Sequence, residues 1–196
     1  MSRWKPDAAG RLIKAAITLF ERQGYEETTV AEIAAAAELT KRTFFRYFAD
    51  KREVLFSGSQ ELEQRWLEAV AAAPAEADPL AAATAGFDSV AEMFTERHEF
   101  AQIRSRIIDS HPELQERELI KLQNLAGAIE SGLVARGVSQ NPATFAAQTA
   151  VTVFHVAFAR WVTEDDAAGF RRLLDESLEE LRAVTSAYVA KEASAV

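Results

Sequence analysis

The feature that most limits how this chain can fold is the spacing of its apolar residues. Over nearly all of its 196 residues they recur at intervals of three and four, and Ala, Leu and Glu are abundant. Such spacing is typical of amphipathic helices, whereas strands alternate apolar and polar residues. No segment reads as a series of strands, so the sequence predicts an all-α protein of about nine helices.

Three helices are predicted in residues 1–50, of which the second and third are short. The first begins near Pro6-Asp7 and ends at Gly24, because glycine accepts the left-handed conformation of a helix C-terminus. The second begins at Thr29, which forms a capping-box pair with Glu32. The third begins after Thr40, the expected N-cap, and a tight turn at about residues 37–39 separates it from the second.

The rest of the chain predicts longer helices and one clear linker, residues 73–78. A fourth helix is expected from Asp50 to about Ala72. The other boundaries follow from caps and prolines: Asp78-Pro79, Ser110-His111-Pro112, Gly137, Asn141-Pro142 and Thr163–Asp166. The expected domains are therefore residues 1–50, with residues 51–72 as a link, and a larger helical body within residues 51–196.

Charge is distributed unevenly between these parts. The net charge is −8 overall, but residues 1–56 carry a net +2 and the remainder −10. Lys41, Arg42 and Arg46 lie in a stretch without acidic residues. A basic surface on an acidic protein can bind DNA at a defined patch, although three charges alone more often mark a solvated helix face.

Composition argues against several other classes of protein. The chain has no Cys, and its three His residues have no metal-ligand spacing. It has no glycine-rich phosphate loop and no GxSxG motif, so neither an enzyme nor a metal or cofactor site is expected. Residues 1–6 do not resemble a signal peptide, and the apolar stretch 143–162 contains Gln148 and Arg160, so we expect a cytoplasmic protein without a membrane span.

The second and third helices follow the helix-turn-helix plan, in which the second of two short helices enters the major groove of DNA. Phe44 and Phe48 are four residues apart and are expected to pack inward together. Lys41, Arg42 and Arg46 would then face outward. This arrangement predicts sequence-specific binding of double-stranded DNA.

The motif around this segment resembles a known family. Gly24-Tyr25, Thr28-Thr29-Val30, Ile33-Ala34 and Thr43-Phe44-Phe45-Arg46-Tyr47-Phe48 with Lys51 are similar to the N-terminal domain of the TetR family of transcriptional regulators. The resemblance covers about residues 8–56. It implies a three-helix DNA-binding head on a larger helical bundle for ligand binding and dimerisation.

The resemblance also implies roles for single residues. Thr29 and Lys51 match phosphate contacts, Thr43 and Tyr47 match DNA contacts, and Lys41 and Arg42 match positions that read bases. Arginine suits guanine, because two of the guanidinium N–H groups can donate to the O6 and N7 atoms of the base at once. The full predicted DNA-binding set is Thr29, Thr40, Lys41, Arg42, Thr43, Phe45, Arg46, Tyr47 and Lys51.

Two residues depart from the family pattern. Phe45 replaces a frequent Tyr, so it lacks a hydroxyl for DNA, and contact with a thymine methyl group is the alternative. Glu38 stands where Gly is frequent, which predicts strain in the turn. For the other residues a structural role remains open: Thr29 as a cap only, Tyr47 as half-buried, and Lys51 as an ordinary first-turn lysine.

The body is expected to dimerise and to bind a small molecule, as the resemblance implies. A mixed apolar lining suits an apolar or amphipathic effector. The pocket candidates are Trp66, Phe87, Met93, Phe94, Phe100, Ile103, Arg106, Ile107, Leu122 and Leu125. The dimer candidates are Phe154, His155, Phe158, Trp161, Leu174, Leu178 and Leu181. For both sets, packing inside the protomer's own core is the alternative.

These features together predict a ligand-responsive repressor that binds a palindromic operator as a homodimer. A transcriptional activator of the same family is one alternative, and a helical interaction protein that does not bind DNA is another. A faint likeness of residues 99–162 to one actinobacterial subset of the family, through Arg104, Ile107, Leu114 and Glu118 among others, indicates no particular effector.

Overall fold

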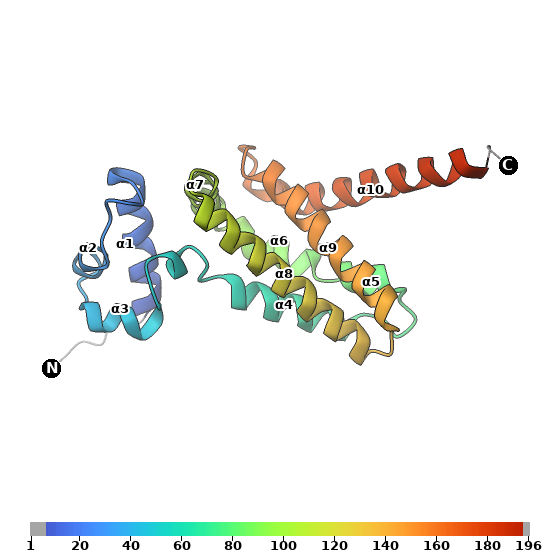
Figure 1. Cartoon of the computed structure of the whole chain (residues 1–196), viewed down its shortest axis with the longest axis horizontal. Helices are drawn as coiled ribbons and strands as arrows, with labels where there is room; N and C mark the ends of the chain where they lie inside the picture. Colours follow the sequence, from blue (N-terminus) through green and yellow to red (C-terminus); the bar gives the residue numbers. More distant parts are fainter. Residues whose placement is uncertain (1–6, 194–196) are drawn as a thin grey trace. The chain divides into compact units, whose positions relative to one another are not determined.

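The computed structural model describes residues 7–193, and side chains as far as residue 186. This part of the chain holds ten α-helices, two 3-10 turns and no strand, which confirms the all-α prediction (Figure 1). In chain order the elements are α1 (Ala8–Gln23), α2 (Val30–Ala36), α3 (Lys41–Tyr47), η1 (Arg52–Val54), α4 (Ser59–Ala72), α5 (Pro79–Thr84), α6 (Phe87–Thr95), α7 (His98–Asp109), α8 (Pro112–Ala135), α9 (Gln140–Trp161), η2 (Ala167–Gly169) and α10 (Phe170–Ala193).

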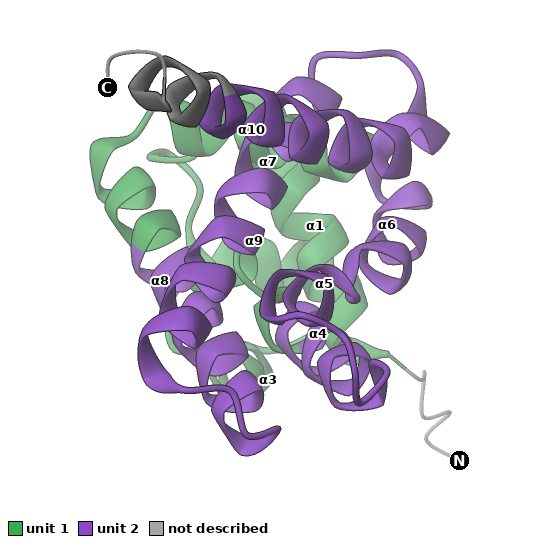
Figure 2. Ribbon diagram, turned by 90° about the vertical axis from the view of Figure 1, so that its right-hand side faces the viewer, with its two compact units in different colours: residues 1–60, 99–119 green, residues 61–98, 120–196 purple. Residues whose placement is uncertain are grey.

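The helices form two compact units, coloured separately in Figure 2. Unit 1 contains residues 1–60 and 99–119, and unit 2 contains residues 61–98 and 120–196. Unit 1 thus includes α7 and the first turns of α8 in addition to the three N-terminal helices. These units are compact in space and each combines two separate ranges of the chain. The domain boundary at residue 50 concerns functional domains, and it remains a prediction.

Local capping signals produce the first three helices. The carboxylate of Asp7 accepts from the backbone N–H of Gly10 at the start of α1, and Pro6 lies outside the described residues. Gly24 ends α1 with φ 90° and ψ 154°, a positive φ as predicted but outside the left-handed helical region. Thr29 and Glu32 form the predicted capping box of α2, and Thr40 caps α3 by accepting from Thr43 at 3.1 Å.

The fourth helix begins later than predicted. Asp50 does accept backbone N–H groups, from Arg52 at 2.8 Å and Glu53 at 3.2 Å, but it opens only the 3-10 turn η1. α4 starts after this turn, at Ser59. The stretch between Pro79 and Asp109, in which the sequence marks few boundaries, contains three separate helices, α5, α6 and α7.

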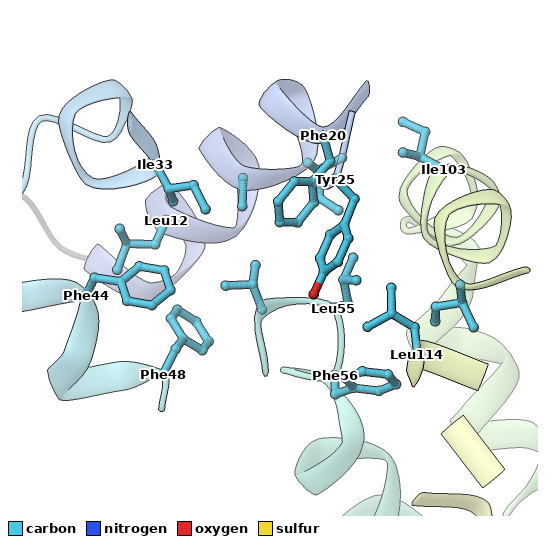
Figure 3. Packing of buried hydrophobic residues seen from close by; sticks show 14 of the residues in the cluster. Leu12, Phe20, Tyr25, Ile33, Phe44, Phe48, Leu55, Phe56, Ile103 and Leu114 are labelled. Carbon is cyan, nitrogen blue, oxygen red and sulfur yellow. The ribbon is translucent and has the colours of Figure 1, made fainter. Parts of the chain in front are cut away.

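The core of unit 1 joins the N-terminal helices to α7 and α8 (Figure 3). Leu12, Phe20, Ile33 and Phe44 form its N-terminal part. The same buried cluster continues through Val54, Leu55 and Phe56 to Ile103, Ile108 and Leu114. Because burial of each such side chain stabilises by about 1.5–3 kcal/mol, Ile103, Ile108 and Leu114 of α7 and α8 add to a core that the N-terminal helices and residues 54–56 mostly form themselves.

Aromatic rings form the core of unit 2. Phe94 lies within 6.1 Å, between ring centroids, of Phe154, Phe158, Trp161 and Phe170. Trp66 contacts Phe154 at 5.5 Å and donates its indole N–H to the carbonyl of Ala83 at 2.7 Å. Edge-to-face ring contacts of this kind add to the stabilisation from burial.

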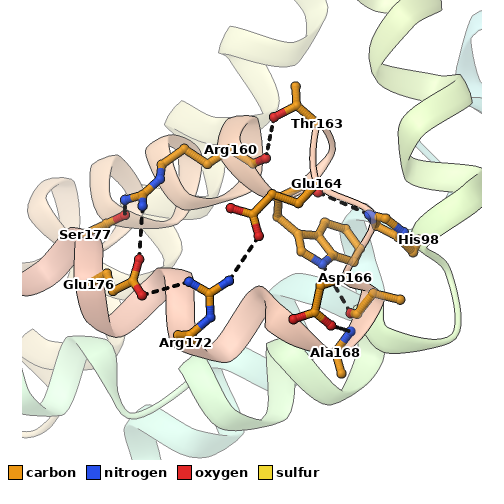
Figure 4. A network of polar contacts seen from close by, with 11 residues as sticks. His98, Arg160, Thr163, Glu164, Asp166, Ala168, Arg172, Glu176 and Ser177 are labelled. Carbon is orange, nitrogen blue, oxygen red and sulfur yellow. Dashed lines mark hydrogen bonds and ion pairs between the residues drawn. The ribbon is translucent and has the colours of Figure 1, made fainter.

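A polar network closes the end of α9 against α10 (Figure 4). Arg160 and Arg172 both bind Glu176, at 3.0 and 2.7 Å, and Arg172 also binds Glu164 at 3.0 Å. At the same end of α9, His98 Nε2 lies 3.1 Å from the carbonyl oxygen of Trp161. Among the described residues, no helix is both long and apolar enough to cross a membrane.

Candidate nucleic-acid interface

The third helix has a buried side and an exposed side, as the helix-turn-helix prediction requires. Phe44 is fully buried and Phe48 is 7% exposed, and their rings lie 5.4 Å apart. Phe45 and Tyr47 are instead 56% and 43% exposed. Burial of the first pair fixes which side of α3 faces outward.

The outer side of α3 carries cations without an ion pair. Lys41, Arg42 and Arg46 are exposed, and within the described part of the chain no salt bridge involves them. Elsewhere in the described part of unit 1, carboxylate partners are found for Arg11, Lys51, Arg52, Arg104, Arg106 and Arg117, whereas Lys14 and Arg22 of α1 have no salt bridge. Uncompensated positive charge on an exposed helix face is suited to phosphate and to the acceptors of guanine.

Arg46 and Tyr47 are held together beside these cations. The Arg46 guanidinium lies 4.9 Å from the centroid of the Tyr47 ring and donates to its hydroxyl at 3.1 Å. This contact limits the rotamers of both exposed side chains. Thr43 is half-buried, and its hydroxyl lies 3.0 Å from that of Thr40.

Thr29 is exposed and belongs to its helix cap. Its backbone N–H and its hydroxyl both donate to the Glu32 carboxylate at 2.8 Å, and these bonds lower the pKa of Glu32 below its ordinary value of 4.5. The hydroxyl oxygen in turn accepts from the backbone N–H of Glu32 at 3.2 Å. The capping role of Thr29 is therefore observed, and its contact with phosphate remains a prediction.

Lys51 is engaged within the protein. Its ammonium group donates to the carbonyl oxygens of Tyr25, Glu26 and Thr28 at 2.8, 3.0 and 3.3 Å. It also lies 4.3 Å from the centroid of the Tyr25 ring, and the side chain is 23% exposed. Lys51 thus satisfies carbonyl groups of the turn between α1 and α2, a role that sequence reasoning did not assign to it.

Two further residues shape this head and were not predicted. Tyr25 is buried between Lys51, Phe20 and His111, and its burial raises the pKa of the phenol from 10.0 to about 12. Arg11 of α1 donates to the carbonyl of Ala37 at the end of α2 and lies 3.5 Å from Glu38. Apart from the contact between Tyr25 and Phe20, these contacts join residues far apart in sequence, so local spacing does not indicate them.

The turn between α2 and α3 has the strain that the sequence predicts. Glu38 adopts φ 55°, in the left-handed region that residues with a Cβ rarely occupy. Its backbone N–H donates to the carbonyl of Ala35 at 2.9 Å, and that of Leu39 to Ala34 at 2.8 Å. The positive φ is therefore part of the turn that places α3 after α2.

The pocket candidates are divided between the units. Phe100, Ile103 and Ile107 belong to the core of unit 1, whereas Arg106 on the same helix is exposed and lies 3.5 Å from Glu21. The remaining candidates, all buried or half-buried, lie in unit 2: Trp66, Phe87, Met93, Phe94, Leu122 and Leu125. The candidates therefore do not form one cluster within either unit.

The structure uses most dimer candidates inside the protomer. Phe154, Phe158, Trp161, Leu174 and Leu178 are at most 9% exposed within unit 2, and their place at a surface between copies remains a prediction. His155 is exposed and Leu181 is half-buried. The outer side of α9 instead presents Phe145 and Val156, which are 75% and 46% exposed. Helical spacing alone cannot tell a core contact from a contact with a partner.

Two family profiles match the chain. Residues 12–57 match the profile of bacterial regulatory proteins of the TetR family, and residues 77–186 match that of the MftR C-terminal domain. The second match alone covers more than half of the 196 residues. Together they include the helix-turn-helix segment and most of unit 2, but not α4.

Curated relatives and solved structures agree with these matches. The chain is 44% identical over 80 residues to the regulator TcmR of Streptomyces glaucescens (41% of this chain, 35% of TcmR). It is 36% identical over 103 residues to the transcriptional regulator MftR of Mycobacterium tuberculosis (51% of this chain, 50% of MftR). The chain thus matches half or less of the length of these relatives.

The fold is similar to that of Thermus thermophilus FadR, a TetR-family repressor solved with lauroyl-CoA. The TM-score is 0.54 at 23% identity, over 87% of this chain and 91% of FadR. At this identity the likeness concerns the fold alone. The chain belongs to the TetR family of transcriptional regulators.

Proposed function

We propose that this protein binds a palindromic operator as a homodimer and represses transcription, with the outer side of α3 in the major groove. The observation that supports this most is the row of exposed cations, Lys41, Arg42 and Arg46, on a helix whose other side is locked into the core by Phe44. Arg42 reads guanine, and Phe45 contacts a thymine methyl group.

Salt-dependent binding of DNA from upstream of its own gene tests the proposal. We expect affinity to fall steeply with salt, because each phosphate contact contributes a slope of about −0.9 in log K against log salt. The Arg42→Ala/Arg46→Ala variant should bind far more weakly. Lys14→Ala/Arg22→Ala, which removes two exposed charges of α1 in the same unit, is the matched control. Equal loss in both variants would indicate binding through general charge only.

The second copy is proposed to pack on the outer side of α9. Phe145, Thr152 and Val156 lie on one side of this helix, since their spacings of seven and four residues are close to whole helical turns. A contiguous exposed apolar surface marks an interaction site, and the proposal takes Phe145 and Val156 as parts of one such face of α9. Phe145→Glu should convert a dimer to a monomer in analytical ultracentrifugation, whereas Thr152→Glu should weaken it less.

An apolar or amphipathic small molecule is the proposed effector, bound in the body. FadR, which shares the fold, was solved with lauroyl-CoA, and the interior of unit 2 here is rich in aromatic rings. In this proposal the ligand changes the spacing of the two heads through the α4 link and releases the operator. A ligand that left both DNA affinity and head spacing unchanged would contradict this mechanism. The protein would act in the cytoplasm, where its DNA lies.

Repression is proposed over activation because FadR, which shares the fold, is described as a transcriptional repressor. A reporter gene placed behind the operator distinguishes the two modes. Deleting the protein should raise expression from a repressed promoter and lower it from an activated one.

A further inference from the structure

Arg104 on α7 joins three parts of unit 1. Its Nε donates to the carbonyl oxygen of Leu55 at 2.6 Å. Its two terminal nitrogens bind the two oxygens of Glu118 on α8, at 3.0 and 2.5 Å. The guanidinium also lies 5.1 Å from the centroid of the Phe56 ring. The Arg104 and Glu118 side chains are only 14% and 22% exposed, so this bidentate pair is better shielded than a surface ion pair.

The segment that Arg104 contacts is also contacted at other points by α7 and α8, two consecutive helices that are called the α7–α8 hairpin below. Arg117 of α8 forms an ion pair with Glu53. Leu55 and Phe56 are 2% and 3% exposed and belong to the buried cluster that contains Ile103, Ile108 and Leu114 (Figure 3). Residues 53–56 are therefore bound to the hairpin by their backbone, by an ion pair and by apolar packing at once.

This segment is also the exit from the proposed DNA-binding head. Phe48 on the buried side of α3 lies five residues before this segment, and Lys51, two residues before it, binds the turn between α1 and α2. On the other side, α8 starts in unit 1 and ends in unit 2, because the unit boundary at residues 119 and 120 falls inside the helix. A continuous helix thus runs from the body into the hairpin.

We propose that Arg104 is a positioning residue that couples the α7–α8 hairpin to the DNA-binding head. A displacement of α8 or α7 is transmitted through the Arg104 guanidinium to Leu55 and Phe56, and from there to α3 and to the α1–α2 turn. This coupling rests on the proposed DNA binding. It would connect the body to the head by a second route, beside the covalent connection through α4. The proposal predicts that substitution of Arg104 changes the affinity for DNA although Arg104 does not contact DNA.

Hydrogen exchange of the full chain, with and without selected operator DNA, tests the coupling. The variants are Arg104→Lys, which keeps the charge but loses the planar fork, and Glu118→Gln, which keeps the volume. Arg22→Gln, an exposed arginine of α1 in the same unit, is the matched control. We expect both Arg104→Lys and Glu118→Gln to speed amide exchange in residues 51–57 of the free protein, and to weaken operator binding about tenfold. Arg22→Gln should do neither.

DNA itself should report the coupling in the wild type. Operator binding is expected to slow exchange not only in α2 and α3 but also in residues 100–118, and this extension should be lost in Arg104→Lys. If amide exchange in residues 51–57 of Arg104→Lys and Glu118→Gln equalled that of the Arg22→Gln control, the proposal would be overturned. This holds even if the wild type binds operator DNA as proposed. If the wild type selected no DNA sequence at all, the proposed function would fail, and exchange in residues 51–57 would still decide whether Arg104 holds this segment.

Discussion

Replacing Lys51 separates a structural role from a DNA-contacting one. In the Lys51→Met variant the side chain keeps its length, but the carbonyl oxygens of Tyr25, Glu26 and Thr28 lose their shared cationic donor. A hydrogen bond to a charged group contributes about 1.5–3 kcal/mol net. The two shorter bonds at the lower bound give about 3 kcal/mol, and water reaching the freed carbonyls recovers part of this. The expected loss is about 2 kcal/mol of unfolding free energy.

Urea unfolding followed by circular dichroism measures this loss, at fixed protein concentration because dimerisation adds to apparent stability. For a chain of this size the melting temperature should fall by about 4–8 °C. Lys14→Met, an exposed lysine of α1, is the control and should change stability little. A Lys51→Met variant as stable as the wild type that bound operator tenfold more weakly would refute the reasoning, since the ammonium would then serve phosphate rather than the turn.

Four further outcomes are expected. Glu38→Gly should stabilise the protein by up to about 1 kcal/mol in urea unfolding, because it relieves the positive φ, less the entropy that glycine adds to the unfolded chain; a loss of stability would contradict strain at this turn. Gly86→Ala should destabilise by about 1–3 kcal/mol, since a Cβ there would lie 2.5 Å from the buried Trp66 ring, and an unchanged melting temperature would show that the ring can move. Bonds from Thr29 lower the pKa of Glu32, so its contribution to stability is present above its ordinary pKa of 4.5 and is lost as pH falls through the lowered value; Glu32→Gln should remove that part of the acid dependence, and identical pH profiles would count against it. Replacing the contacted thymine of the selected operator by deoxyuridine should weaken wild-type binding about fourfold per methyl group but leave Phe45→Ala unaffected, and equal sensitivity of both proteins would exclude the contact.

Local signals in the sequence predicted the head closely. Thr29, Glu32 and Thr40 cap helices through contacts three residues away, and such contacts depend on little beyond the local chain. The buried and exposed sides of α3 also follow from spacing alone. Asp50 was misleading because its carboxylate does accept the backbone N–H groups of Arg52 and Glu53, yet only a 3-10 turn follows it.

Contacts between distant residues were beyond the sequence. Lys51 meets the α1–α2 turn 23 to 26 residues away, and Arg104 meets Leu55 49 residues away. Apolar spacing predicted that α9 would be buried, but it could not show that Phe154 and Trp161 serve the protomer's own core while Phe145 stays exposed. The residues against which an apolar helix face packs are set by the tertiary structure, and the sequence of one helix does not determine them.

Selection of bound sequences from random double-stranded DNA tests the central proposal most directly. The wild-type protein should enrich a palindrome whose half-sites lie about one helical turn apart and contain a guanine, and Arg42→Ala should relax the preference at that guanine alone. Enrichment of no motif by the wild type, or of the same motif by Arg42→Ala, would contradict the proposal that α3 reads bases in the major groove.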